Sequence, residues 1–135
     1  MRQKTNYSEL PNRVVVERIG ASAVIYLTEN IEEIKVEDSV SYLADTYAIS
    51  TANTPDLKTR IEQNFAVWLA KAKQDEYDKL AETIRAERNR RLADTDYTCL
   101  ADRQPSDAMI AYRQALRDLT KQEGFPYMVV WPEIL

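Results

Sequence analysis

The sequence contains no histidine, and this absence excludes several kinds of chemistry. Histidine is the commonest general base and metal ligand, and it is the side chain that titrates near neutral pH. Only two glycines occur among 135 residues, which excludes a glycine-rich phosphate-binding loop. The single cysteine, Cys99, lacks both a histidine to activate it as a nucleophile and a second thiol for an internal disulfide.

The acidic residues do not replace these missing groups. Adjacent acids such as Glu32 and Glu33 fall in predicted strands or turns, where alternation points neighbouring side chains apart. The sequence also lacks the Asp, Asn and Gly pattern of a calcium-binding loop. We therefore expect no catalytic residue, no metal ion, no cofactor and no small-molecule substrate, and hence a protein that is not an enzyme.

Long hydrophobic runs and an excess of positive charge are missing as well. No apolar run approaches the roughly 20 residues that a membrane-spanning helix needs. The net charge of −4 and the pI near 5.0 predict a mildly acidic surface that repels nucleic acid. One cysteine fits a reducing compartment. We expect a cytosolic protein that has neither a membrane nor nucleic acid as its partner.

The first fifty residues have the pattern of β-strands. Residues 14–19 and 23–27 are rich in β-branched side chains, and Gly20-Ala21 between them predicts a tight connection. Residues 31–36 either continue the second strand or form a separate one. Residues 40–49 alternate between two sides. Together these segments predict a small antiparallel sheet.

A helical pattern replaces the β pattern at Thr54. Thr54-Pro55 has the residues of a helix start, and neither glycine nor proline interrupts residues 56–104. A helix from Pro55 to Asp94 would be about 60 Å long, whereas a compact domain of this size has a radius of gyration of about 14 Å. The helix is therefore expected to project from the globular part or to bend near Gln74. Its apolar stripe is expected to cover the sheet: Leu57, Ile61, Phe65, Trp68 and Ala72.

These segments predict an α+β protein with two parts. Residues 1–75 would hold the small N-terminal antiparallel sheet and the first half of the long helix that packs on it. Residues 76–135 would form a helical region with an extended aromatic tail, and its second helix would open at Pro105-Ser106-Asp107. A thin apolar seam along the second half of the long helix, too irregular for a long zipper, is a candidate surface for a homo-oligomer.

Charged residues near the second helix are candidates for structural ion pairs. Asp118 falls in the last turn of this helix, where a negative charge opposes the helix dipole. We expect it to have a partner, either Arg113 or Arg117 or an arginine of the long helix. The arginines between Arg85 and Arg91 are interspersed with acids, which favours a solvated surface with internal ion pairs.

The final segment is the best candidate for a binding function. Phe125, Tyr127, Val129 and Trp131 alternate with other apolar residues, so an extended chain would have apolar groups on both faces. The segment either folds back on the second helix, where Tyr112 would meet it, or is offered to another protein. We predict that Phe125, Tyr127, Val129, Trp131 and Tyr112 bind a partner polypeptide.

Several uncommon features follow one another between residues 80 and 132. An Arg-x-x-Arg-rich helix leads into Leu-Ala-x-x-Asp, then Tyr-Arg-x-x-Leu-Arg-Asp, then Gly-Phe-Pro and a terminal Trp-Pro. The residues concerned are Arg85, Arg88, Arg91, Leu92, Ala93, Asp96, Tyr112, Arg113, Leu116, Arg117, Asp118, Gly124, Phe125, Pro126, Trp131 and Pro132. In order and spacing they resemble the C-terminal segment of phage and prophage tail assembly chaperones, also called tail fibre assembly proteins. Tyr97 departs from that family, which often has tryptophan there.

The resemblance implies a protein that helps phage tail or tail fibre polypeptides to fold, trimerise or assemble. It also implies that this protein acts in the cytoplasm of the host bacterium, during phage growth or prophage expression. Two alternatives stay open. One is a structural tail or baseplate component, and the other is a regulatory module that binds nucleic acid through the arginines between Arg85 and Arg91.

Overall fold

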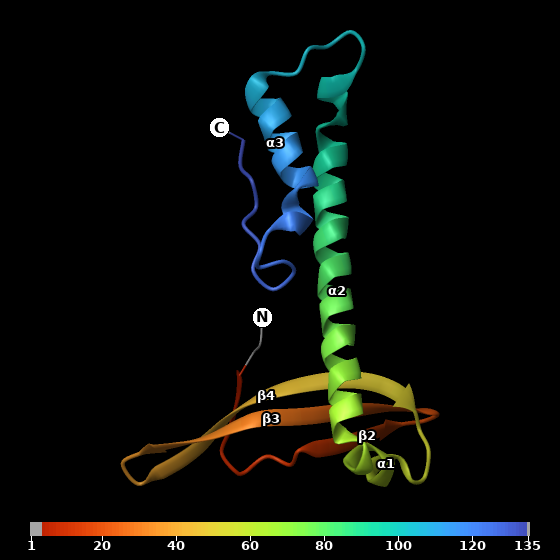
Figure 1. Cartoon of the computed structure of the whole chain (residues 1–135), viewed down its shortest axis with the longest axis vertical. Coiled ribbons are helices and arrows are strands. Elements are labelled where there is room, and N and C mark those ends of the chain that lie inside the picture. The colour runs from red at the N-terminus through yellow and green to blue at the C-terminus, as the bar shows by residue number, and fades with distance from the viewer. Residues whose placement is uncertain (1–3, 135) are drawn as a thin grey trace. The chain divides into compact units, whose positions relative to one another are not determined.

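The computed structural model describes residues 4–134, and the chain divides into two compact units, Met1–Glu76 and Tyr77–Leu135. Helix α2 (Phe65–Asp94) belongs to both, because its first turns lie in the first unit and the remainder lies in the second. Figure 1 shows the course of the chain through each unit. Among the described residues, no helix is long and apolar enough to span a membrane.

The first unit contains an antiparallel sheet, whose four strands within residues 4–134 have the order β1-β4-β3-β2 (Figure 1). The strands are β1 (Lys4–Tyr7), β2 (Val14–Ile19), β3 (Ser22–Val36) and β4 (Ser39–Ala52). The predicted turn between β2 and β3 is present, and Gly20 adopts a φ of 61° that glycine tolerates well. The composition therefore predicts the sheet correctly, although β1 was not expected.

Strand β3 is longer than the strand predicted at residues 23–27, because it continues through a bulge. Glu29 pairs with Asp45, but the next regular pair is Glu32 with Leu43, so β3 has one extra residue at this point. Asn30 in the bulge has a φ of 52°. Residues 31–36 are thus a continuation of the second predicted strand and not a separate one.

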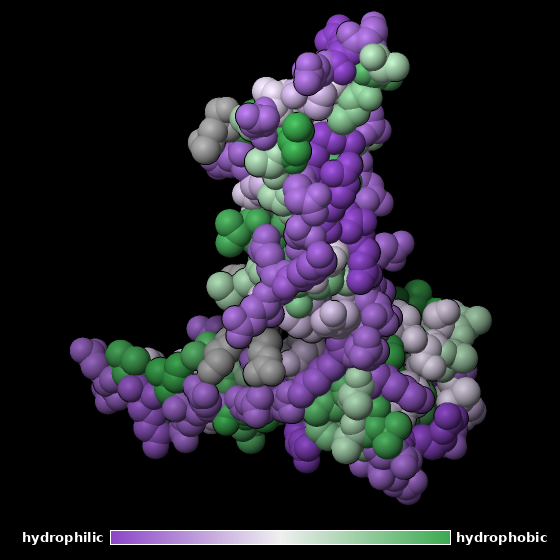
Figure 2. Space-filling model, turned by 45° about the horizontal axis from the view of Figure 1, so that its top comes forward, coloured by the Kyte–Doolittle hydropathy of each residue, from purple (hydrophilic) through white to green (hydrophobic). Residues whose placement is uncertain are grey.

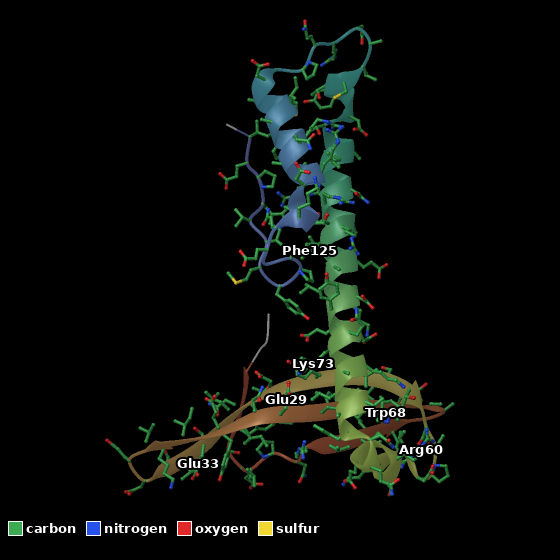
Figure 3. The ribbon with its side chains drawn as sticks, viewed as in Figure 1. Glu29, Glu33, Arg60, Trp68, Lys73 and Phe125 are labelled. Atoms are coloured by element: carbon green, nitrogen blue, oxygen red, sulfur yellow. The ribbon has the colours of Figure 1, made fainter. Side chains whose placement is uncertain are left out.

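Helix α1 (Leu57–Gln63) and the first turns of α2 pack on one face of this sheet. The core cluster consists of Val14, Ala23, Ile25, Leu27, Tyr47, Leu57, Ile61 and Ala72, with Val16, Ile49, Phe65, Trp68 and Leu69 packed against it. Of the five helix residues expected to cover the sheet, Leu57, Ile61 and Ala72 belong to this cluster, and Phe65 and Trp68 pack against it. Lys73 adds a polar link between α2 and the sheet, since its Nζ atom lies 2.5 Å from Glu29 Oε1 (Figure 3).

The helix predicted from Pro55 to Asp94 is interrupted at Asn64, not near Gln74. Asn64 leaves helical geometry with φ −126° and ψ 36°, and its side chain donates to the carbonyl oxygen of Arg60. The Asn64 carbonyl oxygen then accepts from the Trp68 N–H and starts α2. Asparagine favours such breaks because its short amide competes for backbone hydrogen bonds. Helix α1 also begins later than expected, after Asp56.

The second unit is formed by the rest of α2, two short 3-10 turns and a further helix. These elements are η1 (Asp96–Cys99), α3 (Asp107–Arg117) and η2 (Leu119–Lys121). The Ser106 hydroxyl caps α3 by accepting from the Met109 N–H, at the helix start that the sequence predicts. Leu116, Leu119 and Pro126 are fully buried. The expected α+β class, with a sheet packed by a long helix and a helical C-terminal region, is confirmed.

Candidate functional site

The C-terminal tail, defined here as residues 122–134, begins with a tight turn. The Phe125 N–H donates to the carbonyl oxygen of Gln122, and the Met128 N–H donates to that of Gly124 at 2.7 Å. A Cβ atom on residue 124 would lie 2.5 Å from the Met128 carbonyl oxygen and 2.9 Å from the Met128 Cβ atom. The turn therefore needs glycine for lack of space, and not for an unusual backbone angle.

The side chain of Gln122 holds the tail after this turn. Its Nε2 donates to the carbonyl oxygen of Val130, and its Oε1 accepts from the Val130 N–H, each at 2.8 Å. A primary amide offers a donor and an acceptor side by side, as a neighbouring strand would. Gln122 thus satisfies both backbone groups of Val130 and fixes the tail beside η2.

One side of the tail packs on α2 through its aromatic residues. The guanidinium of Arg85 lies 5.4 Å from the ring centroid of Phe125, and that of Arg91 lies 4.3 Å from Trp131 (Figure 3 labels Phe125). These are cation–π distances. The Tyr127 ring meets Tyr77 edge-on, with 6.1 Å between centroids. The tail therefore folds back on its own unit.

The other side of the tail is apolar and exposed. Met128 and Val130 are 75% and 79% exposed, whereas Val129 and Trp131 between and after them are half-buried. Figure 2 shows apolar side chains, in green, on the side of the C-terminal unit where Figure 1 draws the tail. Single exposed apolar residues are ordinary, but two at alternate positions of one extended segment form a surface that another protein can cover.

Tyr112 lies beside the tail on α3, at the edge of a shallow groove. The groove has a volume of about 310 Å³ and is lined by Ala108, Ala111, Tyr112, Ala115, Pro132 and Glu133. Most of its lining is apolar, and its alanines let α3 approach the tail closely. The structure thus brings Tyr112 together with the end of the tail, as the fold-back alternative expects.

Arg113 is buried and joins α3 to the end of α2. Its Nη1 donates to the carbonyl oxygen of Leu92 at 2.8 Å and to Thr95 Oγ1 at 2.6 Å, and its Nη2 donates to Asp96 Oδ1 at 2.7 Å. The last carbonyl groups of a helix lack partners within the helix, so a cation from α3 is well placed there. Arg113 therefore ties the two helices together.

Asp118 has its partners close by in sequence. Its carboxylate accepts from Lys121 Nζ at 2.6 Å and from Gln114 Nε2 at 2.9 Å. The hydrogen bond from Gln114, followed by that from Lys121, lowers the pKa of the Asp118 carboxyl group. The cationic partner of Asp118 is thus Lys121 and not one of the arginines expected from the sequence. Arg113 pairs with Asp96, and Arg117 is exposed. The i,i+3 spacing of Asp118 and Lys121 is a signal that could have identified this pair.

The arginines of α2 form an ion-pair network on the helix surface. Arg90 binds Glu87 with two nitrogens, at 2.7 and 2.8 Å, and reaches Asp94 with a third. Arg91 donates to Glu87 at 2.8 Å, and the two residues have the i,i+4 spacing that favours such a pair. The hydrogen bonds from Arg90 and then Arg91 lower the pKa of Glu87 from 4.5 to about 2. Much of the positive charge is therefore neutralised within the helix.

This network predicts a loss of stability in acid. Glu87 has a lower pKa when folded, so its contribution is complete above pH 4.5 and disappears as the pH falls towards 2. In unfolding titrations at several pH values, the difference in unfolding free energy between the natural protein and Glu87→Gln should shrink across this range. Glu82→Gln, at an exposed position of the same helix, is the control. A difference that stays constant between pH 4.5 and 2 would contradict the role of Glu87.

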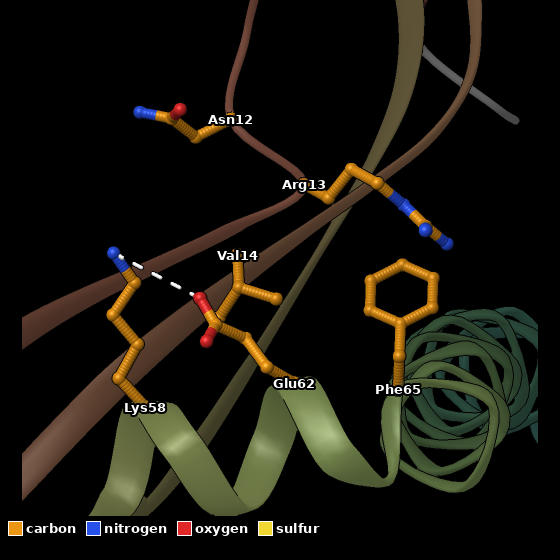
Figure 4. Close-up of a pocket in the computed structure, with 6 residues that line it drawn as sticks. All are labelled: Asn12, Arg13, Val14, Lys58, Glu62 and Phe65. Atoms are coloured by element: carbon orange, nitrogen blue, oxygen red, sulfur yellow. Dashed lines mark ion pairs between the residues drawn. The ribbon is translucent and has the colours of Figure 1, made fainter.

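A second hollow lies in the first unit, between α1 and the start of β2. It has a volume of about 260 Å³ and is lined by Asn12, Arg13, Val14, Lys58, Glu62 and Phe65 (Figure 4). The Arg13 guanidinium lies 4.0 Å from the Phe65 ring centroid, and Lys58 pairs with Glu62. Both cations thus have partners. Within residues 4–134 there is no group of three or more acidic, cysteine or histidine side chains that would hold a metal ion.

Residues 81–134 match the model of one protein family, described as phage tail assembly chaperone protein. This segment, which is less than half of the chain, is similar to that family. The match confirms the resemblance seen in the sequence, and it covers the end of α2, α3 and the tail. Comparisons with curated proteins and with solved structures gave no match.

The matched segment, residues 81–134, contains the candidate binding and ion-pair residues that the sequence singles out. Tyr112, Arg113, Arg117, Asp118 and the tail all lie within it, whereas the sheet, α1 and the start of α2 lie outside it. Of the five residues predicted to bind a partner, Tyr127 is exposed and the other four are half-buried. Sequence reasoning missed Met128 and Val130, which are more exposed than any of these five.

Proposed function

We propose that the protein is a phage tail assembly chaperone that binds tail or tail fibre polypeptides and assists their folding or assembly. The observation that carries this proposal is the match of residues 81–134 to the phage tail assembly chaperone family. In this proposal the protein is not an enzyme. It acts in the cytoplasm of the host bacterium, where tail polypeptides are made.

The exposed side of the tail supports a direct role in this binding. Met128 and Val130 are available without any rearrangement, whereas the Tyr127 ring meets Tyr77 of α2 edge-on. Phe125 and Trp131 are held against Arg85 and Arg91. For these two rings to bind a client polypeptide, the tail would have to leave α2. We therefore assign the first contact to Met128 and Val130.

A binding experiment with point variants tests this proposal. The immobilised protein is offered tail and tail fibre polypeptides from the same phage or prophage. Met128→Ser combined with Val130→Ser should lower recovery by about ten-fold or more, because burial of each apolar side chain contributes about 1–2 kcal/mol. Both residues are exposed, so the variant should fold normally. A chain ending at Glu123 is less suitable, because it also loses the buried Pro126.

The matched control lies in the other unit. Ile19 and Val36 are each 60% exposed, so Ile19→Ser with Val36→Ser removes similar apolar groups from the sheet. This control should retain the tail polypeptide as well as the natural protein does. Equal recovery by the tail variant would refute the assigned surface. Failure of the natural protein to retain any tail polypeptide would refute the proposed function.

A further inference from the structure

Between residues 128 and 131 the tail has the side-chain exposure pattern of an extended strand. Side-chain exposure alternates along it, since Met128 and Val130 point outwards while Val129 and Trp131 are half-buried. In an extended chain, the N–H and C=O groups of one residue point to the same edge, and those of the next residue point to the opposite edge. The backbone of this segment therefore has two distinct edges.

The inner edge is already satisfied within the chain. Both backbone groups of Val130 are bound by the side chain of Gln122. Residue 132 belongs to the same edge and is a proline, so it has no N–H group to satisfy. The position of the proline thus removes a donor from the edge that is covered, and leaves the donors of the other edge in place.

The outer edge is open. Within residues 4–134, the backbone N–H and C=O groups of Val129 and Trp131 have no hydrogen-bond partner. In Figure 1 the tail runs along the outside of α3, and no other element of the C-terminal unit is drawn beyond it. Donors and acceptors repeated at every second residue are what a strand presents to a new neighbour.

We propose that this outer edge binds an extended segment of a client tail polypeptide, which adds to it as a β-strand. The inference rests on the proposed function and adds the way in which the client is held. A helix has no free backbone groups along its length, so the unpaired groups of Val129 and Trp131 select an extended chain. Met128 and Val130 then contact every second side chain of the added strand.

The charge of the tail indicates the kind of strand that fits. Residues 122–134 contain two acids, Glu123 and Glu133, and no lysine or arginine. A client strand with basic residues at its ends would complement these carboxylates. A second copy of the same tail would bring like charges together. The occupant is therefore a basic-flanked client strand and not a second copy.

The test uses a synthetic peptide of alternating valine and threonine with lysine at both ends. Binding should slow hydrogen exchange of the Val129 and Trp131 amides by about ten-fold or more, as measured by NMR, and leave Val130 unchanged. The same peptide with its central amides N-methylated keeps every side chain but has no N–H groups to donate at those positions. It should bind at least about ten-fold more weakly.

Each other outcome decides against the inference. Equal binding of the methylated peptide would mean capture by side chains alone. Equal or tighter binding of a peptide with glutamate ends would refute the charge argument. Slowed exchange of Val129 and Trp131 that appears with protein concentration alone would assign the edge to a second copy. If tail polypeptides bind while the lysine-ended peptide does not, the strand-addition inference fails and the proposed function stands.

Discussion

Replacing Leu116 by alanine is expected to lower the free energy of unfolding of the C-terminal unit by about 3 kcal/mol. Leu116 lies on α3 and is fully buried, as are Leu119 and Pro126. Truncation removes apolar contacts and leaves a cavity that a small unit cannot easily close. Since small domains have only about 5–15 kcal/mol of stability, this change is a large part of the total.

Fluorescence of Trp131 provides the measurement. The chain has two tryptophans, Trp68 in the first unit and Trp131 in the second, so Trp68→Phe leaves a reporter for the C-terminal unit alone. Urea titrations in this background compare Leu116→Ala with Ile110→Ala. Ile110 is on the same helix but 53% exposed, so its loss should cost only about 0.5 kcal/mol. Similar effects of the two changes would contradict the assigned core.

Replacing Arg113 by methionine should cost about 2–3 kcal/mol. Methionine keeps an unbranched apolar side chain but removes the three hydrogen bonds to Leu92, Thr95 and Asp96. The Thr95 side chain is nearly buried, so water cannot easily replace the lost donor. The contact between α3 and the end of α2 should therefore weaken.

Two further variants show whether geometry or charge matters at this position. Arg113→Lys keeps the positive charge but cannot reach three acceptors at once, so it should recover less than half of the loss. Arg117→Met removes an exposed arginine one turn further on and should change stability by about 0.5 kcal/mol at most. The same urea titration measures all three. Full recovery by lysine would show that charge alone accounts for the effect.

The sequence predicts those parts of the fold that depend on local patterns. Runs of β-branched residues, the glycine between Ile19 and Ala21, and the apolar stripe from Leu57 to Ala72 each depend on side chains close together in the chain. Their periodicity reflects which face is buried, so it survives in the sequence. The α+β class follows from these elements.

Two features of the fold escape this reasoning because they depend on one residue. The break at Asn64 falls within a continuous apolar stripe, which hides the preference of asparagine for helix ends. The bulge shifts the phase of β3: Ile25 and Leu27 face the core from odd positions, whereas Ile34 faces the same side from an even one. When the alternation of buried and exposed side chains shifts by one residue, the sequence fits two separate strands as well as it fits one bulged strand.

The tail shows the corresponding limit for the candidate site. Its composition predicts apolar groups on both faces, but the outward face depends on contacts distant in sequence. The guanidinium groups of Arg85 and Arg91 pack on the rings of Phe125 and Trp131. With these rings held against α2, Met128 and Val130 are exposed. The roles of Gln122 and Gly124 likewise depend on residues that only the folded chain brings close.

The exposed thiol of Cys99, in the 3-10 turn after α2, affects how the protein must be handled. Two molecules can become covalently linked through this group when air oxidises a concentrated sample. Such linked pairs would elute at twice the expected mass and imitate a genuine self-association along α2. Gel filtration should therefore be carried out with a reductant or with Cys99→Ser. The same lone thiol accepts one fluorophore at a known position, close to the junction that Arg113 makes.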